Sequence, residues 1–215
     1  MLSAQQTGHE ELAQTRLAVY RFLFAALSKP TPGQHIWMAG PDFRSGLGLL
    51  CEEFGLPCPE GELVPGEYAD HESRYLACFE VGLPGPPVPL LASHYHRKEP
   101  APRIIHEHVL FYKRFGTRPA DTLESADHLL DELAFLVRLD ELLLAGRMEA
   151  ESVLHGRRDF LARQGAQWPA RAAALAHERG LPPVYRTLLA LLAVAVEQDL
   201  ALSEAAVADL AKENS

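Results

Sequence analysis

Apolar residues recur at intervals of three and four positions along residues 127–145, and this spacing constrains the fold more than any other feature of the chain. A period of 3.6 residues brings such positions onto one side of a helix. The stripe comprises Leu129, Leu133, Leu136 and Val137. We therefore predict an amphipathic helix that ends at residue 145, before a glycine.

Two polar residues, Asp127 and His128, lie in the first turn of this predicted helix, with Ser125 as the expected N-cap. An acidic residue suits the positive end of the helix dipole, whereas a histidine there needs another reason. Glu132 lies one turn after His128, on the same side. In one interpretation Asp127 accepts backbone N–H bonds and His128 packs against a neighbouring loop. In the other, the pair lines one end of a binding groove.

Helical spacing continues through most of the remaining chain. We expect helices over residues 10–28, 42–54, 67–79, 101–115, 148–164, 168–179 and 182–202, with a short tail helix at 203–212. No segment shows the alternation of a strand, and no repeat of fixed period is present. The fold class expected is all-α, with about eight or nine helices in a single globular domain that spans residues 1–215.

Three charged residues within these predicted helices have different interpretations. Arg16 is the one polar residue within the apolar stripe of the first predicted helix. The adjacent acids Asp140 and Glu141 are most simply the solvated face of the helix that contains them.

Residues 82–91 interrupt the helical pattern with four prolines. Because proline lacks an amide hydrogen and fixes φ, this stretch cannot form a regular helix or a central strand. We expect a stiff, extended connector of polyproline type. It is either a rigid linker or a wall of a groove, with Tyr75 and Phe79 as an apolar floor and Tyr95 beyond it. Aromatic residues of this kind equally often belong to a core.

The net charge of −9 argues against nucleic acid as a partner, because phosphate binding needs a basic patch. It favours a basic partner, such as a peptide that carries arginines. Three cysteines without a Cys-x-x-Cys motif argue against a disulfide framework and against a thiolate zinc site. A reducing compartment is the simplest interpretation.

Residues 1–15 lack a basic start followed by an apolar core, so no secretory signal is expected there. The longest uncharged apolar run, residues 187–196, is about half of the roughly 20 residues needed to cross a bilayer. We therefore predict a core helix at 187–196 and no membrane insertion. The sequence leaves open whether the protein is a monomer or a homodimer.

Motifs for catalysis are absent: there is no Gly-x-Ser-x-Gly elbow and no phosphate-binding glycine loop. Histidines two positions apart on a helix face different ways, which disfavours a shared metal ion. No catalytic residue, metal or cofactor is therefore expected. Two alternatives remain open, a generic helical adaptor and a metal- or haem-binding helical enzyme. The enzyme would use His94, His96, His106, His108 or His128.

Four segments resemble, in order, those of the TorD/DmsD/NarJ family of chaperones that assemble molybdenum-containing oxidoreductases. These are residues 72–79, the proline loop 85–90, 106–116 and the helix 127–139 with its pattern Asp-His-x-x-x-Glu-Leu-x-Phe-Leu-x-x-Leu. There are two departures: Ser125-Ala126 stands where the family often has a proline just before Asp-His, and Cys78 where leucine is common. The histidine-rich residues 93–96 resemble the branch that serves type II enzymes of the dimethyl sulfoxide reductase family.

The resemblance implies an all-helical, non-enzymatic chaperone of the cytoplasm. Its partner would be the catalytic subunit of a molybdoenzyme of the dimethyl sulfoxide reductase family, bound through the twin-arginine signal peptide or another part. The chaperone would assist insertion of the molybdenum cofactor and delay export. The residues expected to bind this client are Tyr75, Phe79, Pro87, Pro89, Tyr95, Asp127, His128 and Glu132. Asp127 and Glu132 would offer charge to arginine, while Tyr75 and Phe79 would offer apolar surface.

Overall fold

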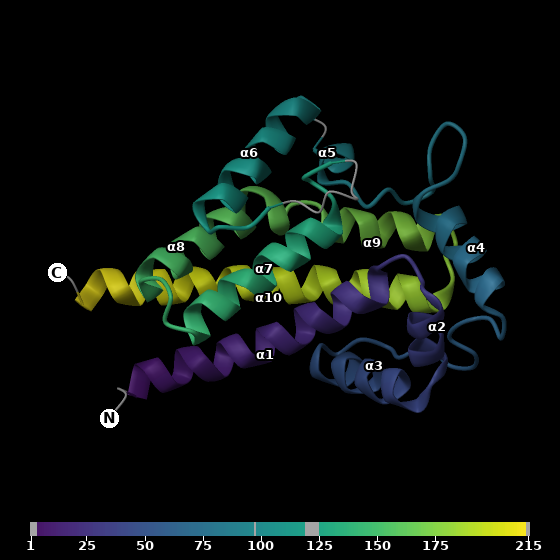
Figure 1. Cartoon of the computed structure of the whole chain (residues 1–215), viewed down its shortest axis with the longest axis horizontal. Helices are drawn as coiled ribbons and strands as arrows, with labels where there is room; N and C mark the ends of the chain where they lie inside the picture. Colours follow the sequence, from purple (N-terminus) through teal and green to yellow (C-terminus); the bar gives the residue numbers. More distant parts are fainter. Residues whose placement is uncertain (1–3, 97, 119–124, 214–215) are drawn as a thin grey trace. The chain divides into compact units, whose positions relative to one another are not determined.

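The computed structural model describes residues 4–96, 98–118 and 125–213, and these residues form helices and loops with no strand (Figure 1). The predicted all-α fold class is confirmed. The chain divides into two compact units. Unit 1 comprises residues 1–24, 91–167 and 196–215, and unit 2 comprises residues 25–90 and 168–195.

Unit 1 contains six helical segments. They are α1 (Ala4–Leu27) up to residue 24, α5 (Ala92–Tyr95), α6 (Ala101–Arg114), α7 (Leu129–Leu144), α8 (Ala150–Phe160) with the π-turn Leu161–Gly165, and the second part of α10 (Pro183–Glu213). An aromatic cluster packs α6, α7 and α8 together. The Phe135 ring lies 4.8 Å from the Phe160 ring and 5.1 Å from the Tyr112 ring, measured between centroids. A Cβ atom at Gly156 would lie only 2.1 Å from the Phe115 ring, so α8 needs a glycine at this contact.

A buried network of four charged side chains joins the helices of unit 1. Arg157 on α8 binds Asp140 on α7 at 2.6 Å and Asp199 on α10 at 2.5 Å. Arg16 on α1 binds Asp140 at 3.0 Å and Asp199 at 3.5 Å. Tyr20 also donates a hydrogen bond of 2.7 Å to Asp199. We call these four charged residues the ion network. Two cations and two anions cancel, which makes their burial tolerable.

The interpretation of Asp140 as part of a solvated face is therefore wrong. Its side chain is fully buried, whereas that of the neighbouring Glu141 is 39% exposed and pairs with Arg21. Arg16, the polar residue in the apolar stripe of α1, lies within the core because its two carboxylate partners lie there. Helical spacing alone does not distinguish a paired buried charge from a solvated one.

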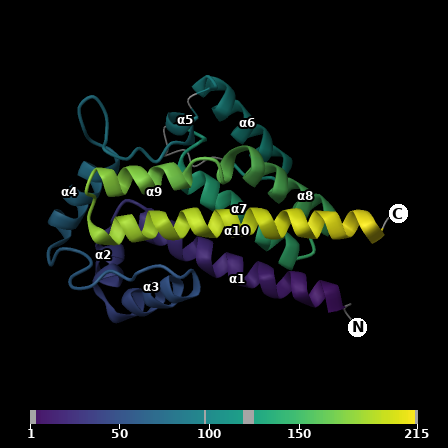
Figure 2. The ribbon, with the colours of Figure 1, turned by 180° about the vertical axis from the view of Figure 1, so that it is seen from behind.

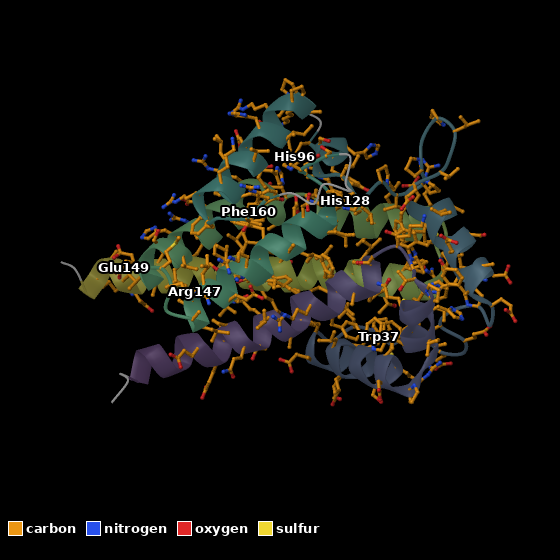
Figure 3. The ribbon with its side chains drawn as sticks, viewed as in Figure 1. Trp37, His96, His128, Arg147, Glu149 and Phe160 are labelled. Carbon is orange, nitrogen blue, oxygen red and sulfur yellow. The ribbon has the colours of Figure 1, made fainter. Side chains whose placement is uncertain are left out.

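Unit 2 contains α2 (Pro32–Ala39), α3 (Pro41–Glu53), α4 (Tyr68–Phe79), α9 (Pro169–Glu178), the first part of α10 and the last residues of α1. Spacing did not predict α2. It starts with a capping box in which the Thr31 side chain accepts from the Gln34 amide, with a proline in the first turn. Trp37 packs edge-on against Phe43 with 4.9 Å between ring centroids, which joins α2 to α3 (Figure 3).

The long helix α10 is continuous from residue 183 to residue 213, where the sequence suggested two helices (Figure 2). The first helix begins at residue 4 rather than residue 10, and the 148–164 helix ends in a π-turn. Within the described part of the chain, none of the helices combines the length and apolarity that crossing a membrane requires.

Candidate functional site

The segment just before α7 is held against the segment that contains α5. The Asp127 carbonyl accepts a hydrogen bond of 3.0 Å from the Ala92 amide, and Leu91 forms an antiparallel bridge with His128. The Asp127 carboxylate accepts a bond of 2.8 Å from the Ser93 amide. We call residues 91–93 and 125–128 the Asp127 junction. The junction joins Leu91, the last residue of the proline-rich connector, to Asp127 and His128. The connector and the Asp-His pair were both predicted to be features of the site.

Asp127 is fully buried, and its carboxylate is occupied by intramolecular donors. The Ser125 hydroxyl donates to one oxygen and the Ser93 amide to the other. Burial alone would raise the pKa of Asp127, but the hydrogen bonds from Ser125 and Ser93 outweigh it and lower the pKa below its ordinary value. The carboxylate is therefore ionised and caps α5, whose first turn contains Ser93.

His128, and not Ser125, is the N-cap of α7. Its backbone is extended, with φ −73° and ψ 140°, and its Nδ1 accepts a hydrogen bond of 3.2 Å from the Leu130 amide. Burial lowers the pKa of His128, in keeping with a neutral ring that accepts at Nδ1. The prediction that Asp127 and His128 lie inside the first turn is wrong, because both precede the helix. The hydrogen bonds of Asp127 and His128 fit the interpretation of the pair as a polar cap against a loop, and the groove interpretation stays a prediction.

Glu132 forms a buried pair with His108 of α6. Its carboxylate lies 2.7 Å from Nε2 of His108, whose Nδ1 lies 2.8 Å from the Ile104 carbonyl. Both ring nitrogens therefore face acceptors, which favours the doubly protonated cation. Burial would lower the pKa of His108, but the hydrogen bond and charge of Glu132 outweigh it, and the pKa is raised. The negative charge of Glu132 is thus matched within unit 1.

The predicted site residues of unit 2 lie mostly in its core. Tyr75 and Phe79 are 2% and 4% exposed, and their rings pack against each other and against Tyr185. Pro89 is buried and Pro87 is half-buried.

The eight predicted site residues fall into one group in each unit. Tyr75, Phe79, Pro87 and Pro89 belong to unit 2, and Tyr95, Asp127, His128 and Glu132 belong to unit 1. Asp127 and His128 meet at the junction, whereas Tyr95 is buried in α5. His128, which is labelled in Figure 3, and Pro87 are half-buried, and the other six are buried.

The proline-rich connector turns back on itself instead of running extended. A Cβ atom at Gly82 would lie 2.1 Å from the Gly85 carbonyl oxygen, so this close approach requires glycine. Val81 and Leu83 at this turn are 63% and 101% exposed. The Val88 amide donates a hydrogen bond of 3.1 Å to the Cys78 carbonyl, which fixes the end of the loop to α4. The loop therefore presents apolar side chains to solvent from an anchored base.

One segment of unit 2 concentrates acidic charge. Residues 42–80 contain nine carboxylates and two arginines, a net charge of −7 out of −9 for the whole sequence. Eight of these acids are exposed and one is half-buried: Asp42, Glu52, Glu53, Glu60, Glu62, Glu67, Asp70 and Glu80, with Glu72 half-buried. We call residues 42–80 the acidic segment. The total charge of the chain does not reveal this concentration, whereas the distribution of charge along the sequence does.

In the described ranges, no group of three or more His, Cys, Asp and Glu side chains is arranged to hold a metal ion. His108, one of the histidines considered for such a site, already has a partner at each ring nitrogen.

Comparison with known proteins identifies the family. The family model for the nitrate reductase delta subunit matches residues 65–174, about half of the chain, which include the connector, the Asp127 junction and α7. A curated relative, the dimethyl sulfide dehydrogenase assembly chaperone protein of Rhodovulum sulfidophilum, is 30% identical over 199 residues. The match covers 86% of this chain and 79% of the relative.

The chain belongs to the nitrate reductase delta subunit family. The predicted membership of the TorD/DmsD/NarJ group of molybdoenzyme assembly chaperones is thereby confirmed, and a member of this family is an assembly chaperone rather than an enzyme. No solved structure gave a significant match. All eight predicted site residues lie within the matched residues 65–174.

Proposed function

We propose that this chaperone binds the catalytic subunit of a molybdenum-cofactor oxidoreductase of the dimethyl sulfoxide reductase family in the cytoplasm. It holds the subunit, through its twin-arginine signal peptide, until the cofactor has been inserted, and so delays export. The observation that carries this proposal is the match over 86% of the chain to a relative named as the assembly chaperone of dimethyl sulfide dehydrogenase.

The surface of unit 2 is chemically complementary to a peptide in which arginines are followed by apolar residues. The acidic segment provides exposed carboxylates that attract guanidinium groups over distances of about a Debye length. Its last acid, Glu80, is followed directly by the exposed Val81 and Leu83. Charge and apolar surface thus follow one another in the same unit, as they do in such a peptide.

The residues predicted from the family divide into two roles in this proposal. His128 and Pro87 are half-buried and are available to contact the client. The buried members act by position: Asp127 fixes the end of the connector through Ala92 and Ser93, and Tyr75 donates a hydrogen bond of 3.0 Å to the Leu27 carbonyl. Glu132 is matched by His108, so it is proposed to shape unit 1 rather than to bind an arginine.

A pull-down from the native host, grown under anaerobic respiratory conditions, tests the proposal. The tagged chaperone is expected to recover one large molybdoenzyme subunit as its main partner, identified by mass spectrometry. The same experiment with a client that lacks its signal peptide should recover much less of it. Recovery of folded bait without any molybdoenzyme subunit would contradict the proposed client class, and equal recovery of the truncated client would contradict the signal-peptide site.

A further inference from the structure

Two helices, one in each unit, present exposed residues in the same spacing but with opposite charge. Both stripes follow the spacing i, i+3, i+7, i+10 and i+11, with a leucine at the third position. The stripe on α3 of unit 2, which we call the acidic face, comprises Asp42, Ser45, Leu49, Glu52 and Glu53. The stripe on α6 of unit 1, which we call the basic face, comprises Arg103, His106, Leu110, Lys113 and Arg114.

Each face points away from the unit to which its helix belongs. At about 100° per residue, the other four members of each stripe lie within about 60° of the leucine around the helix axis. The leucines are unusually exposed for their type, Leu49 at 68% and Leu110 at 53%. The opposite sides of the two helices are buried and contain Phe43, Leu47 and Cys51 of α3, and Ile104, His108 and Tyr112 of α6.

The charge of opposite sign on each helix lies outside its face. Arg44, the one cation of α3, donates a hydrogen bond of 2.7 Å to the Gly61 carbonyl. Glu107, the one acid of α6, is half-buried and accepts a hydrogen bond of 2.7 Å from Gln164. Glu107 also pairs with Arg103 at 3.3 Å, but the arginine side chain is 66% exposed, and such surface pairs hold their partners weakly. Each face therefore presents charge of a single sign around its leucine.

We propose that the acidic face of α3 binds the basic face of α6 in a second copy of this chain. When the two helices run parallel with Leu49 against Leu110, acids and bases lie level with each other along both stripes. The contact buries two exposed leucines and surrounds them with pairs of opposite charge. Charges that flank an apolar seam in this way select the partner and the direction of a helix pair.

The occupant is a second copy because each copy supplies both halves of the contact. Both faces are exposed in a single copy, so the chain does not join them itself. Any other copy offers the complementary charge, with the same spacing and in equal amount. The contact makes no use of the acids in residues 60–80, so the inference does not depend on the proposed client.

The expected association is weak and sensitive to salt. One pair of short helices, of 13 and 14 residues, forms an interface at the small end of the range for specific complexes. Its charges are exposed before binding, and dissolved salt screens the attraction between them. Self-association should therefore rise with protein concentration and fall as salt is added.

Sedimentation velocity of the full chain tests the proposal at protein concentrations up to about 100 μM, in about 50 mM and about 500 mM salt. Wild type should exceed the mass of one chain at low salt and return toward it at high salt. The acidic-face variant, Glu52→Lys with Glu53→Lys, should self-associate at least about tenfold more weakly. The basic-face variant, Lys113→Glu with Arg114→Glu, should lose association to the same degree.

Mixing the two variants separates a lost contact from a damaged fold. The basic-face variant keeps its acidic face, and the acidic-face variant keeps its basic face, so an equimolar mixture should associate as wild type does. A chain that carries all four substitutions should also self-associate, because its charges are reversed on both faces. The control Glu149→Lys with Glu204→Lys changes the net charge as the acidic-face variant does, at exposed positions of unit 1, and should stay within about twofold of wild type.

Three outcomes would overturn the proposal. In the first, wild type keeps the mass of one chain at every concentration in low salt, which leaves both faces without a second copy. In the second, the control pair weakens association as much as either face variant does. In the third, each face variant is monomeric but their mixture is monomeric too, although circular dichroism shows the helical content of wild type in both.

Discussion

In unit 1 the charges of the ion network, of Glu132 and of Asp127 are buried against protein partners, whereas in unit 2 all but one of the carboxylates of the acidic segment are exposed. The buried polar groups of unit 2 are of another kind. His35 Nδ1 lies 3.2 Å from His71 Nδ1, and His71 Nε2 lies 3.1 Å from the Tyr185 hydroxyl. With Tyr185 donating to His71, His71 to His35, and His35 to the Gly66 carbonyl, one neutral tautomer satisfies every contact.

The difference assigns different tasks to the two units. A buried ion pair depends on correct geometry, so the ion network favours one packing of α1, α7, α8 and α10 within unit 1. Exposed carboxylates contribute little to folding but attract a basic partner. The ion network of unit 1 thus holds structure, whereas the acidic segment of unit 2 is the part that we propose attracts the client.

Breaking the ion network should give the largest effect on stability. Arg157→Met removes the cation that lies between Asp140 and Asp199 and leaves both carboxylates short of a partner. We expect a loss of about 3–5 kcal/mol in the free energy of unfolding, measured by urea denaturation. The control Arg158→Met changes the neighbouring arginine, which is 33% exposed and pairs with Asp159, and should cost less than about 1 kcal/mol. Equal losses in the two variants would contradict the structural role of the network.

The next largest effect should come from Glu132→Gln. Because the pKa of His108 is raised in the folded chain, its stabilisation is present in full below the ordinary histidine pKa and is lost as pH rises above it. The variant should lose about 2–4 kcal/mol at about pH 5.5 and less at about pH 8.5, because the stabilisation diminishes as pH rises through the raised pKa of His108. A loss that is the same at both pH values would show that His108 is not the partner that matters.

A smaller effect on stability, with the opposite dependence on pH, should come from His71 in unit 2. Burial, with the neighbouring His35 and Arg74, lowers the pKa of His71 to about 4. As pH falls from about 6.5 toward about 4, the unfolded chain takes up a proton that folded His71 refuses, so stability should fall by about 1–3 kcal/mol. His71→Gln should remove this part of the pH dependence, whereas His177→Gln, at an exposed position of the same unit, should keep it. An unchanged pH profile in His71→Gln would contradict the interpretation that His71 is held neutral by its burial and its contacts with His35 and Tyr185.

The smallest effect on stability should come from the acidic segment. The triple variant Glu60→Gln, Glu62→Gln and Glu67→Gln removes three exposed charges, and surface charges of this kind rarely change stability by more than about 0.5 kcal/mol. Thermal unfolding followed by circular dichroism checks this. A large loss would place these acids among the groups that hold the fold and would remove the contrast between the two units.

The sequence predicted the helices that carry a clear apolar stripe, including α4 and α6 to within one residue at each end and α7 to within three. It missed α2, whose signal was the capping spacing from Thr31 to Gln34 rather than its apolar pattern. The ion network could not be predicted from the sequence, because Arg16 and Asp140 are 124 positions apart and residue spacing carries no information on which distant charges form pairs. The loop opposite Asp127 was equally hidden, since Leu91 and Ser93 reach it only through the tertiary fold.

The local sequence pattern predicted which residues belong to the candidate site but not how the fold places them. The family pattern selected Asp127 and His128, and the structure gives them partners, but spacing placed them inside the helix because His128 is a rare N-cap. Burial of Tyr75 and Phe79 was not readable, because an aromatic pair four residues apart fits a groove floor and a core equally well.

The measurement that tests the central claim most directly is the affinity of the client's signal peptide, labelled with a fluorophore and titrated at several salt concentrations. The acidic-segment triple variant is compared with a matched triple in unit 1, Glu149→Gln, Glu151→Gln and Glu204→Gln, which changes the net charge equally at exposed positions. We predict that the acidic-segment variant binds at least about tenfold more weakly and with less dependence on salt, while the control stays within about twofold of wild type. Equal affinities for the two triple variants would contradict the account.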